Sequence, residues 1–342
     1  MQTLTDPLMK TKIESDANRR VLTGIRASGK LHIGNYFGAV RPALELQKKY
    51  LCNFFVADLH ALTTNKDAKL MSDSTFDCVA LWLACGLERS RSIIYRQSDV
   101  PFVAEFAWYL SSVTGMGLLE KGHAYKDALA NSREVNHAIF SYPVLMAADI
   151  CMYDADLVPV GKDQKQHVEM ARDMAGSFNA VYGDNLIKLP EVVIDEKVML
   201  IPGLDGRKMS KSYGNEIPFF CDEKTLRKKI LSVVTDSTSL EAPKSIEGTV
   251  LGDFYKLFAT PVQVNDLGSR MQQGGMGWGH AKEELFEVIN TYLKETRAAY
   301  VQLRGDEAAL EMILEDGAEK ARAMAKPVIN RVREAMGFRV LY

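Results

Sequence analysis

The first two hundred residues alternate short apolar runs with longer amphipathic segments, and this alternation restricts the possible folds more than any other feature. The apolar runs are predicted to be strands, at residues 21–23, 53–57, 92–95 and 157–160. The segments between them repeat apolar residues every three or four positions, as helices do, at residues 36–49, 70–85, 102–110 and 164–178. Strands that alternate with helices predict a parallel sheet covered on both faces, and such sheets bind ligands at the carboxyl ends of their strands.

The last third of the chain differs, because from about residue 226 the pattern is nearly all helical. Helices are predicted at residues 226–234, 252–258, 281–303, 307–325 and 328–336, and Pro327 is expected to break the last long helix. The sequence thus predicts an α/β fold with a Rossmann-like parallel sheet in a domain at residues 19–218. We expect a flexible extension before it, at residues 1–18, and a small all-helical domain after it, at residues 219–342. The last helix is a candidate to pack back on the α/β domain.

Composition limits the binding partners and the cellular compartment that we expect for the chain. A net charge of −2 argues against non-specific binding to nucleic acid. Residues 224–229 and 320–339 nevertheless concentrate positive charge, either as a binding face or as an ordinary solvated helix face. The first 18 residues lack an apolar signal core, and no apolar run approaches the roughly 20 residues that cross a bilayer, so we expect a cytoplasmic protein without a membrane partner. Free buried thiols, rather than disulfides or a zinc site, are expected for Cys52, Cys78, Cys85, Cys151 and Cys221.

Two short motifs about 175 residues apart together predict a nucleotide site. The first, TGIRASGKLHIGN at residues 23–35, passes from a strand through a Gly- and Ser-rich turn to the start of an amphipathic segment. Backbone N–H groups and the helix dipole at such a start bind phosphate, and His32 and Asn35 lie on one face of its first turn. The second motif, KMSKS at residues 208–212, carries two positive charges on a glycine-flanked loop that we expect to be mobile.

In this order the motifs resemble the His-Ile-Gly-His and Lys-Met-Ser-Lys-Ser signatures with which class I aminoacyl-tRNA synthetases bind ATP. YPVLMAAD at residues 142–149 and VPVGKDQKQH at residues 158–167 further resemble the tryptophan subgroup of that family. The resemblance covers roughly residues 20–342. It implies an enzyme that activates tryptophan with ATP, releases pyrophosphate and transfers tryptophan to its tRNA. It also implies a homodimer whose helical domain serves the anticodon side of the tRNA.

The resemblance implies that Lys208, Lys211, His32 and Asn35 are the catalytic residues, because charge build-up on phosphate oxygens is the main barrier. Magnesium is expected to be held mainly by the phosphates, with no metal site made by the protein. The loop is expected to close over ATP, with Met209 as its anchor. Asp163 is expected to accept hydrogen bonds from the ribose hydroxyls. The full set of expected ATP ligands is Arg26, Ser28, Gly34, Asn35, Gly161, Asp163, Lys208, Met209, Ser210, Lys211 and Ser212.

Selectivity for the amino-acid side chain is expected from residues 142–149. An indole N–H is a donor without acceptor capacity, so a carboxylate in an apolar run, Asp149, is a natural partner for it unless a protein group takes that place. Met146 lies on the same helical face and is expected against the indole, and Tyr142 is expected at the α-amino group. Gln164 is expected near the α-ammonium or carboxylate. The resemblance of residues 58–60 to the Asp-x-His of the family implies that His60 lies on the floor of the pocket, either as support for the fold or in contact with the substrate.

Two departures and several rivals accompany this interpretation. Arg26 stands where the subgroup often has Gln, and it suits either the amino-acid carboxylate or a phosphate. A family lysine that reaches the phosphates has only Lys126 as a candidate here. Rival functions are a tyrosyl-tRNA synthetase, a small-molecule nucleotidyltransferase and a regulatory paralogue that binds RNA or tryptophan only. The aromatic segment at residues 100–119 is either a dimer interface or part of the core.

Overall fold

The computed structural model describes residues 19–27, 31–130, 134–160, 165–194, 201–210 and 213–341. These residues divide into two compact units. The first unit takes in the described residues within Met1–Gly29, Pro42–Lys197 and Asp306–Tyr342. The second takes in those within Lys30–Arg41 and Val198–Gly305.

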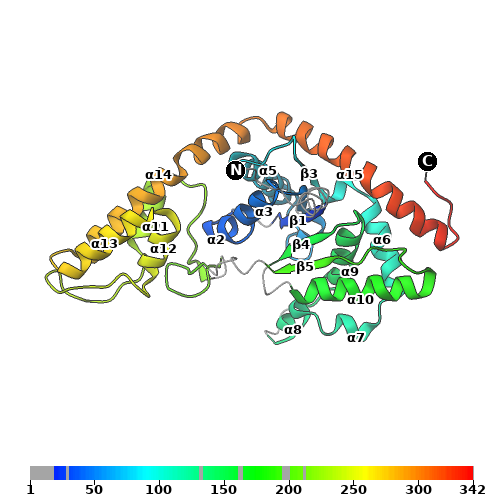
Figure 1. Cartoon of the computed structure of the whole chain (residues 1–342), viewed down its shortest axis with the longest axis horizontal. Coiled ribbons are helices and arrows are strands. Elements are labelled where there is room, and N and C mark those ends of the chain that lie inside the picture. Colours follow the sequence, from blue (N-terminus) through cyan, green and yellow to red (C-terminus); the bar gives the residue numbers. More distant parts are fainter. Residues whose placement is uncertain are drawn as a thin grey trace, which may run out of the picture. The chain divides into compact units, whose positions relative to one another are not determined.

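A parallel sheet forms the centre of the first unit, and in the described residues it has five strands in the order β3-β2-β1-β4-β5 (Figure 1). Four of them confirm the predicted strands, and the Rossmann-like α/β class is confirmed with them. The fifth, β5, was missed because its run of four residues is too short to stand out. The order reverses direction between β1 and β4, the kind of switch point at which such sheets bind ligands. The strands are β1 (Arg20–Arg26), β2 (Leu51–Ala57), β3 (Ser92–Arg96), β4 (Leu157–Val160) and β5 (Glu191–Ile194).

Helices cover both faces of this sheet, as the alternating pattern predicts. Successive side chains of a strand point to opposite faces. Phe55 therefore joins the core formed with α6, α9, α10 and α15, while Phe54 packs on Trp82 of α5 with ring centroids 4.6 Å apart. The predicted helices at 70–85, 102–110 and 164–178 are confirmed with small shifts of their ends. The helices of this unit include α4 (Asp58–Ala61), α5 (Ala68–Ala84), α6 (Phe102–Ser111), α7 (Met116–Leu119), α8 (His123–Ala130), α9 (His137–Cys151), α10 (Lys165–Tyr182) and α15 (Glu307–Ala335), with a 3-10 turn η2 (Gln97–Asp99).

The prediction that Pro327 breaks the last helix is wrong, because α15 continues through it as one helix of 29 residues. Proline removes one backbone hydrogen bond, but buried residues on both sides of it, Ala325 and Val328, keep the helix packed on the core. Ten residues before Pro327, Gly317 lies so close to β3 that an added Cβ would come within 1.8 Å of the Ile94 carbonyl oxygen. The helix thus belongs to the α/β unit.

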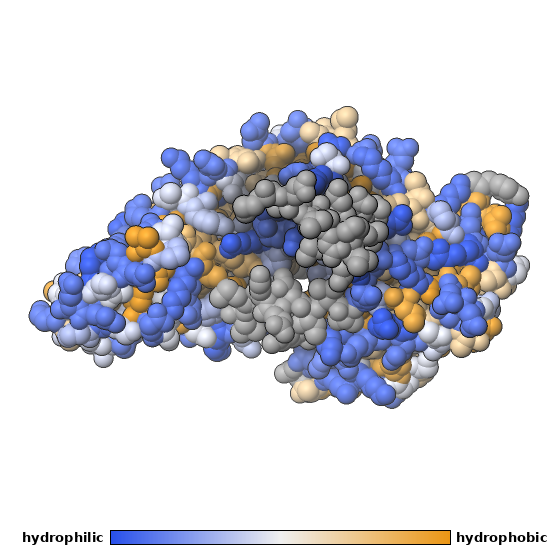
Figure 2. Space-filling model, viewed as in Figure 1, coloured by the Kyte–Doolittle hydropathy of each residue, from blue (hydrophilic) through white to orange (hydrophobic). Residues whose placement is uncertain are grey.

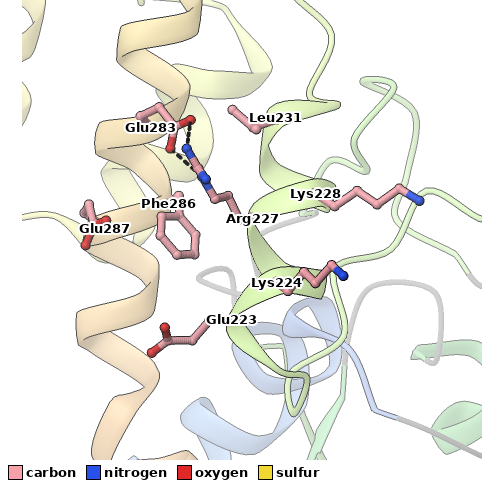
Figure 3. Close-up of a pocket in the computed structure, with 8 residues that line it drawn as sticks. All are labelled: Glu223, Lys224, Arg227, Lys228, Leu231, Glu283, Phe286 and Glu287. Atoms are coloured by element: carbon pink, nitrogen blue, oxygen red, sulfur yellow. Dashed lines mark hydrogen bonds and ion pairs between the residues drawn. The ribbon is translucent and has the colours of Figure 1, made fainter.

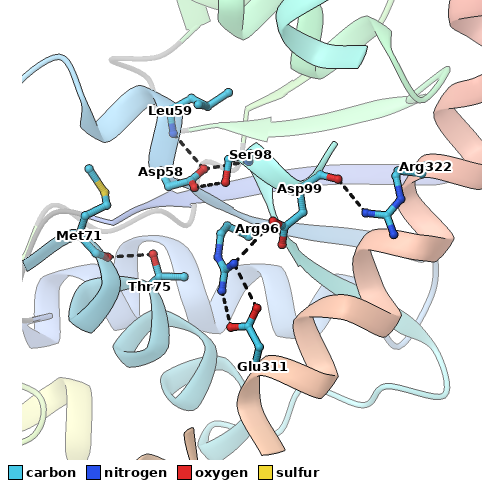
Figure 4. Close-up of polar contacts among 9 residues, drawn as sticks. All are labelled: Asp58, Leu59, Met71, Thr75, Arg96, Ser98, Asp99, Glu311 and Arg322. Atoms are coloured by element: carbon cyan, nitrogen blue, oxygen red, sulfur yellow. Dashed lines mark hydrogen bonds and ion pairs between the residues drawn. The ribbon is translucent and has the colours of Figure 1, made fainter. Parts of the chain in front are cut away.

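Ion pairs also hold α15 against the sheet (Figure 4). The Arg96 guanidinium at the end of β3 donates to both carboxylate oxygens of Glu311, at 3.2 and 2.6 Å. Arg322 donates to the carbonyl oxygen of Asp99 at 2.8 Å. These contacts join residues more than 200 positions apart, which explains why no sequence pattern located them.

The second unit is mainly helical. It begins with α2 (Ile33–Asn35) and a π-helical turn η1 (Tyr36–Val40), and the chain passes into the first unit at the start of α3 (Arg41–Leu46). The helix predicted at 36–49 is therefore present but irregular. α13 was missed because its sequence is polar and interrupted by Gly268, although a capping box of Thr260 and Gln263 marks its start. The other helices are α11 (Glu223–Leu231), α12 (Val250–Phe258), α13 (Pro261–Gln273) and α14 (Trp278–Arg304).

The division into units differs from the boundary expected at residues 218 and 219. Residues 31–33 pair with residues 217–219, through the Ile33 N–H to the Ile217 carbonyl at 3.0 Å and the Phe219 N–H to the Leu31 carbonyl at 2.9 Å. The His-Ile-Gly-Asn end of the first motif, residues 32–35, therefore groups with the lysine loop, whereas its first residues stay in β1 of the sheet. The last helix, α15, groups with the first unit and not with the helical one. The expected extension at residues 1–18 lies outside the described residues.

All five cysteines are free; Cys52, Cys78 and Cys151 are buried, and Cys85 and Cys221 are half-buried. Among the described helices, none is both long enough and apolar enough to pass through a bilayer. The face drawn in Figure 2 is mostly hydrophilic, with hydrophobic residues in scattered patches.

Candidate active site

The His-Ile-Gly-Asn end of the first motif, residues 32–35, forms a closely packed turn in the second unit. His32 precedes α2, and its backbone N–H donates to the side-chain oxygen of Asn35 at 3.0 Å. A Cβ on Gly34 would lie 2.9 Å from the His32 ring nitrogen and 3.3 Å from the sulfur of Met209. Only glycine fits this approach, and the contact brings the two signature motifs side by side.

In the second motif Met209 is buried, whereas the first lysine, Lys208, lies at the surface. Met209 is 5% exposed, as expected for an anchor, and its N–H donates to the Ile201 carbonyl at 3.1 Å. Lys208 is exposed. The side chain of Asn215, which sequence reasoning missed, accepts from the Ser210 N–H at 2.8 Å and donates to the Lys208 carbonyl at 3.2 Å. The described part of the loop therefore has a fixed base that presents a cation.

A second cluster, in the first unit, lies at the carboxyl ends of β2 and β3. Asp149 on α9 is 3% exposed, and its carboxylate accepts hydrogen bonds from the Gln97 side-chain amide at 2.8 Å to each oxygen. The Nε2 atom of His60 lies 2.8 Å from one of the same oxygens. Gln97, which is fully buried in η2, also accepts weakly from the His60 backbone N–H at 3.4 Å. Two elements that follow different strands, α4 after β2 and η2 after β3, thus converge on one carboxylate of α9.

The environment of Asp149 raises the pKa of its carboxyl group. Burial disfavours the charged form, and this outweighs the hydrogen bonds and charge of His60 and the hydrogen bond of Gln97, which lower the pKa. Asp58, which is nearby, also raises it. With Gln97 and His60 as its partners, this buried carboxylate has acceptor capacity left for one more donor.

Asp58 itself has a supporting role. Its carboxylate accepts from the backbone N–H groups of Leu59 at 2.9 Å and Ser98 at 3.0 Å, and from the Ser98 hydroxyl (Figure 4). These bonds hold α4 against η2, and so place His60 and Gln97 relative to each other.

Tyr142 and Met146 lie on the same face of α9 as Asp149, at positions i, i+4 and i+7, and both are half-buried. The Tyr142 hydroxyl contacts the Nε2 atom of His167 on α10, a residue to which the sequence analysis gave no role. The Tyr142 and His60 rings are edge to face, 6.3 Å apart. This face of α9 therefore presents a hydroxyl, a thioether and a carboxylate in a row.

Arg26 ends β1 in the same unit. Its side chain is open to solvent on one side, yet enough protein surrounds it that desolvation lowers the pKa of the guanidinium, while Tyr142 raises it. No hydrogen bond or ion pair of this guanidinium to another described residue is present. A cation so placed suits an anionic substrate group.

The remaining expected residues are less informative. Lys126 is exposed on α8. In the part of the chain that the structure describes, no group of three or more His, Cys, Asp or Glu could hold a metal ion. Six expected ligands lie outside the described residues and stay predictions: Ser28, Gly161, Asp163, Gln164, Lys211 and Ser212.

A family model and the sequences of known proteins indicate the same family for this chain. Residues 14–294 match the model of the class I tRNA synthetases for W and Y. The tryptophan–tRNA ligase of Campylobacter jejuni (strain RM1221) is 45% identical over 318 residues, which cover 93% of this chain and 99% of the relative. The Fusobacterium nucleatum tryptophan–tRNA ligase is 44% identical over 319 residues, covering 93% and 98%.

Solved structures agree. The C. jejuni tryptophanyl-tRNA synthetase complexed with ADP and tryptophan has a TM-score of 0.89 at 45% identity, covering 93% of this chain and all of that one. The Mycoplasma pneumoniae tryptophanyl-tRNA synthetase has a TM-score of 0.78 at 28% identity, covering 94% and 98%.

A sheet with this switch point, a His-Ile-Gly-Asn turn and a Lys-Met-Ser-Lys-Ser loop are the parts of a class I aminoacyl-tRNA ligase. The chain belongs to the class I tRNA synthetases, in the family that comprises the tryptophan and tyrosine enzymes. Within that family, each relative described above is a tryptophan enzyme.

Proposed function

We propose that this enzyme activates tryptophan with ATP and transfers it to the tRNA for tryptophan. In the first step a carboxylate oxygen of tryptophan attacks the α-phosphorus of ATP, the bond to the β-phosphate breaks, and pyrophosphate leaves with the electron pair. In the second step a ribose hydroxyl of the tRNA attacks the carbonyl carbon of the adenylate, and AMP leaves. We propose the cytoplasm as the compartment in which the enzyme works.

The observation that carries the tryptophan assignment is the buried carboxylate of Asp149. Gln97 and His60 fill part of its acceptor capacity and neither brings a permanent positive charge, so the carboxylate still favours a further donor. An indole N–H is such a donor and offers no acceptor that would have to be satisfied in return. Met146 on the same face supplies a polarisable thioether for an aromatic ring.

For the activation step, the residues of this chain act by position and charge. Lys208, with Lys211 expected beside it, would draw negative charge on the β- and γ-phosphates toward the protein as the bond breaks. Arg26 would hold the tryptophan carboxylate or a phosphate. We propose that Mg²⁺ arrives with ATP on its phosphates, whose oxygens are the ligands it prefers.

The test is ATP–pyrophosphate exchange on the purified protein with each of the twenty amino acids. Exchange with tryptophan alone is expected, followed by charging of tRNA. Exchange with tyrosine would give Asp149 a phenol as its partner and refute the tryptophan assignment. Silence with all twenty would refute the activation step itself.

A surface for tRNA phosphates is proposed on α11, at the predicted basic segment 224–229. Two of its cations already have partners within the protein. Arg227 donates to Glu283 of α14 at 2.9 and 2.7 Å, and Lys229 donates to the Gly214 carbonyl at 3.3 Å. Lys224 and Lys228 extend away from α14 (Figure 3). Phosphate contacts of this kind supply affinity without reading sequence.

Reversing both charges tests this surface. The variant Lys224→Glu with Lys228→Glu is expected to raise the KM for tRNA at least about tenfold at moderate salt, with unchanged pyrophosphate exchange. Lys69→Glu, on α5 of the other unit, is the control. An unchanged KM for tRNA would remove α11 from the interface.

A homodimer is proposed through the outer side of α6. Of the aromatic residues expected there, Phe106 is fully buried in the core, but Trp108 is 77% exposed and Met116 on α7 is 63% exposed. An exposed tryptophan suits the core of a two-fold interface with a second copy of the chain. Trp108→Ser is expected to shift the mass in solution from dimer toward monomer, and an unchanged dimer would refute the location.

A further inference from the structure

We propose that Asn215 is a positioning residue for adenylate formation, which fixes the backbone on both sides of Met209 and so sets where the lysine loop starts. The proposal rests on the proposed function, in which Lys208 and Lys211 act on the phosphates of ATP. Asn215 itself is 4% exposed and acts through the loop.

The side chain of Asn215 binds the loop as a neighbouring strand would. In an extended segment, the carbonyl of one residue and the N–H two positions later point to the same side. Asn215 pairs with such a set, because its amide nitrogen donates to the Lys208 carbonyl at 3.2 Å and its oxygen accepts from the Ser210 N–H at 2.8 Å. The opposite edge is paired with backbone, through the Met209 N–H to the Ile201 carbonyl. Met209 thus sits on a short strand held at both edges.

The same amide also fixes the turn that precedes the loop. Its nitrogen donates to the carboxylate of Asp205 at 2.7 Å, a bond that is the largest cause of the lowered pKa of that carboxyl group. The backbone carbonyl of Asn215 accepts from the Leu204 N–H at 2.9 Å. Both amide hydrogens and the amide oxygen are therefore used, and no other small side chain offers two donors and an acceptor in this geometry.

Gly203 is the structural counterpart of this arrangement. A Cβ at position 203 would lie 2.1 Å from the amide nitrogen of Asn215 and 2.3 Å from its carbonyl carbon, so only glycine leaves room for the amide. A methyl group there would expel the side chain from the loop without removing it. This gives a second, independent way to break the same contact.

The consequence for catalysis follows from where the loop leads. Met209 contacts the first signature motif at Gly34, and Lys211 follows two residues later. A shift of the backbone at Met209 would therefore displace the charges that stabilise the transition state, and misplacement by about 1 Å can cost about 100-fold in rate. Tryptophan binding, which depends on the other unit, would change little.

The first experiment compares Asn215→Ala with the matched variant Asn179→Ala in single-turnover adenylate formation. Asn179, on α10 of the first unit, holds the N–H and carbonyl of Ile187 in the same manner, at 2.7 and 2.8 Å. Asn215→Ala is expected to slow formation about 10- to 100-fold with the KM for tryptophan within about twofold. Asn179→Ala is expected to lower the Tm without slowing it.

The double variant tests the geometry. Gly203→Ala alone is expected to match Asn215→Ala, and Gly203→Ala with Asn215→Ala to be no slower than either, since one contact is lost in all three. Additive losses, or a folded Asn215→Ala enzyme at the wild-type rate, would overturn the proposal.

Limited trypsin digestion tests the positioning role of Asn215 independently of the proposed enzymatic function. Cleavage after Arg207 and Lys208 is expected to speed up at least about tenfold in both single variants, because an unpaired loop opens more often. Equal cleavage in wild type and variants would overturn the positioning role even if the wild-type enzyme activated no amino acid. Activity of the wild type with tryptophan tests the proposed function separately.

Discussion

Replacing Asp149 with Asn removes one charge and almost no volume, so it isolates the electrostatic part of tryptophan recognition. In the structure the Gln97 amide donates to both carboxylate oxygens, which favours an oxygen at that side of the new amide. The new NH₂ group then faces His60 Nε2, which can accept in its other tautomer. The variant loses the Gln97 hydrogen bond at the new nitrogen atom, but the new amide keeps Gln97 as a donor on its oxygen and His60 as an acceptor for its NH₂ group, so it is expected to fold.

The size of the effect follows from the oxygen that remains. One carboxylate oxygen has both Gln97 and His60 as partners, while the other has Gln97 alone and is the expected acceptor of the indole N–H. In the variant this acceptor is still an oxygen, but a neutral one. A hydrogen bond to a charged group contributes about 1.5–3 kcal/mol and a neutral one about 0.5–1.5, so the loss is about 1–1.5 kcal/mol. The KM for tryptophan should rise about tenfold, with a smaller change in kcat.

The assay is pyrophosphate exchange with tryptophan and with its benzothienyl analogue, in which sulfur replaces the indole N–H. Wild type should prefer tryptophan, and Asp149→Asn should reduce that preference about tenfold. Asp156→Asn, a carboxylate that accepts from the Arg20 N–H at 2.7 Å and pairs with Lys188, is the control and should keep it. A variant that retains the wild-type preference would show that the indole N–H has another partner.

Three further predictions concern the fold, the lysine loop and pH. Gly317→Ala should cost at least about 3 kcal/mol of unfolding free energy in denaturant titrations, because its Cβ would meet the Ile94 carbonyl at 1.8 Å, whereas Gly176→Ala, in open space on α10, should be neutral or stabilising. Lys211→Ala should slow adenylate formation about 100-fold with tryptophan affinity unchanged in a fluorescence titration. Tryptophan affinity should fall with decreasing pH, starting above the ordinary aspartate range because burial raises the pKa of Asp149, and Asp149→Asn should lack this limb.

The pH prediction has a counterpart in stability. A carboxyl group whose pKa is higher in the folded than in the unfolded protein stabilises the fold only while it is protonated. That contribution is complete below the unfolded pKa of Asp149 and is lost as pH rises through the raised folded value. Wild type should therefore lose stability relative to Asp149→Asn across this window, and a constant difference between the two unfolding free energies would contradict the raised pKa.

Local patterns in the sequence predicted the elements that make local contacts. Strands β1 to β4 were identified because their runs are short and apolar, and the α9 face with Tyr142, Met146 and Asp149 because helical spacing fixes it. Gln97 was missed, although a polar residue directly after a strand in a parallel sheet is a recognisable signal. Its partner Asp149 is 52 positions away, and only the folded chain shows that they meet.

Packing over long distances in the sequence decided the rest. Local preference argued that Pro327 ends a helix, but burial of Ala325 and Val328 outweighs the lost hydrogen bond. The grouping of residues 30–41 with the lysine loop depends on pairing with residues 217–219, which no periodicity reveals. The sequence therefore predicted which motifs carry the candidate site residues. Only the long-range contacts of the folded chain show to which unit each motif belongs.

In each unit a neutral side-chain amide positions a group proposed to act on the substrates, and there is a physical reason for an amide at both places. Gln97 holds Asp149 through two hydrogen bonds, and Asn215 holds the backbone of Lys208 through another, without adding charge. A cation in place of Gln97 would lower the pKa of Asp149 and satisfy its charge, so the indole N–H would gain less from binding there. A carboxylate in place of Asn215 would repel the carboxylate of Asp205. It would also neutralise part of the positive charge of the lysines that the phosphates require. Amides position these groups and leave their charges for the substrates.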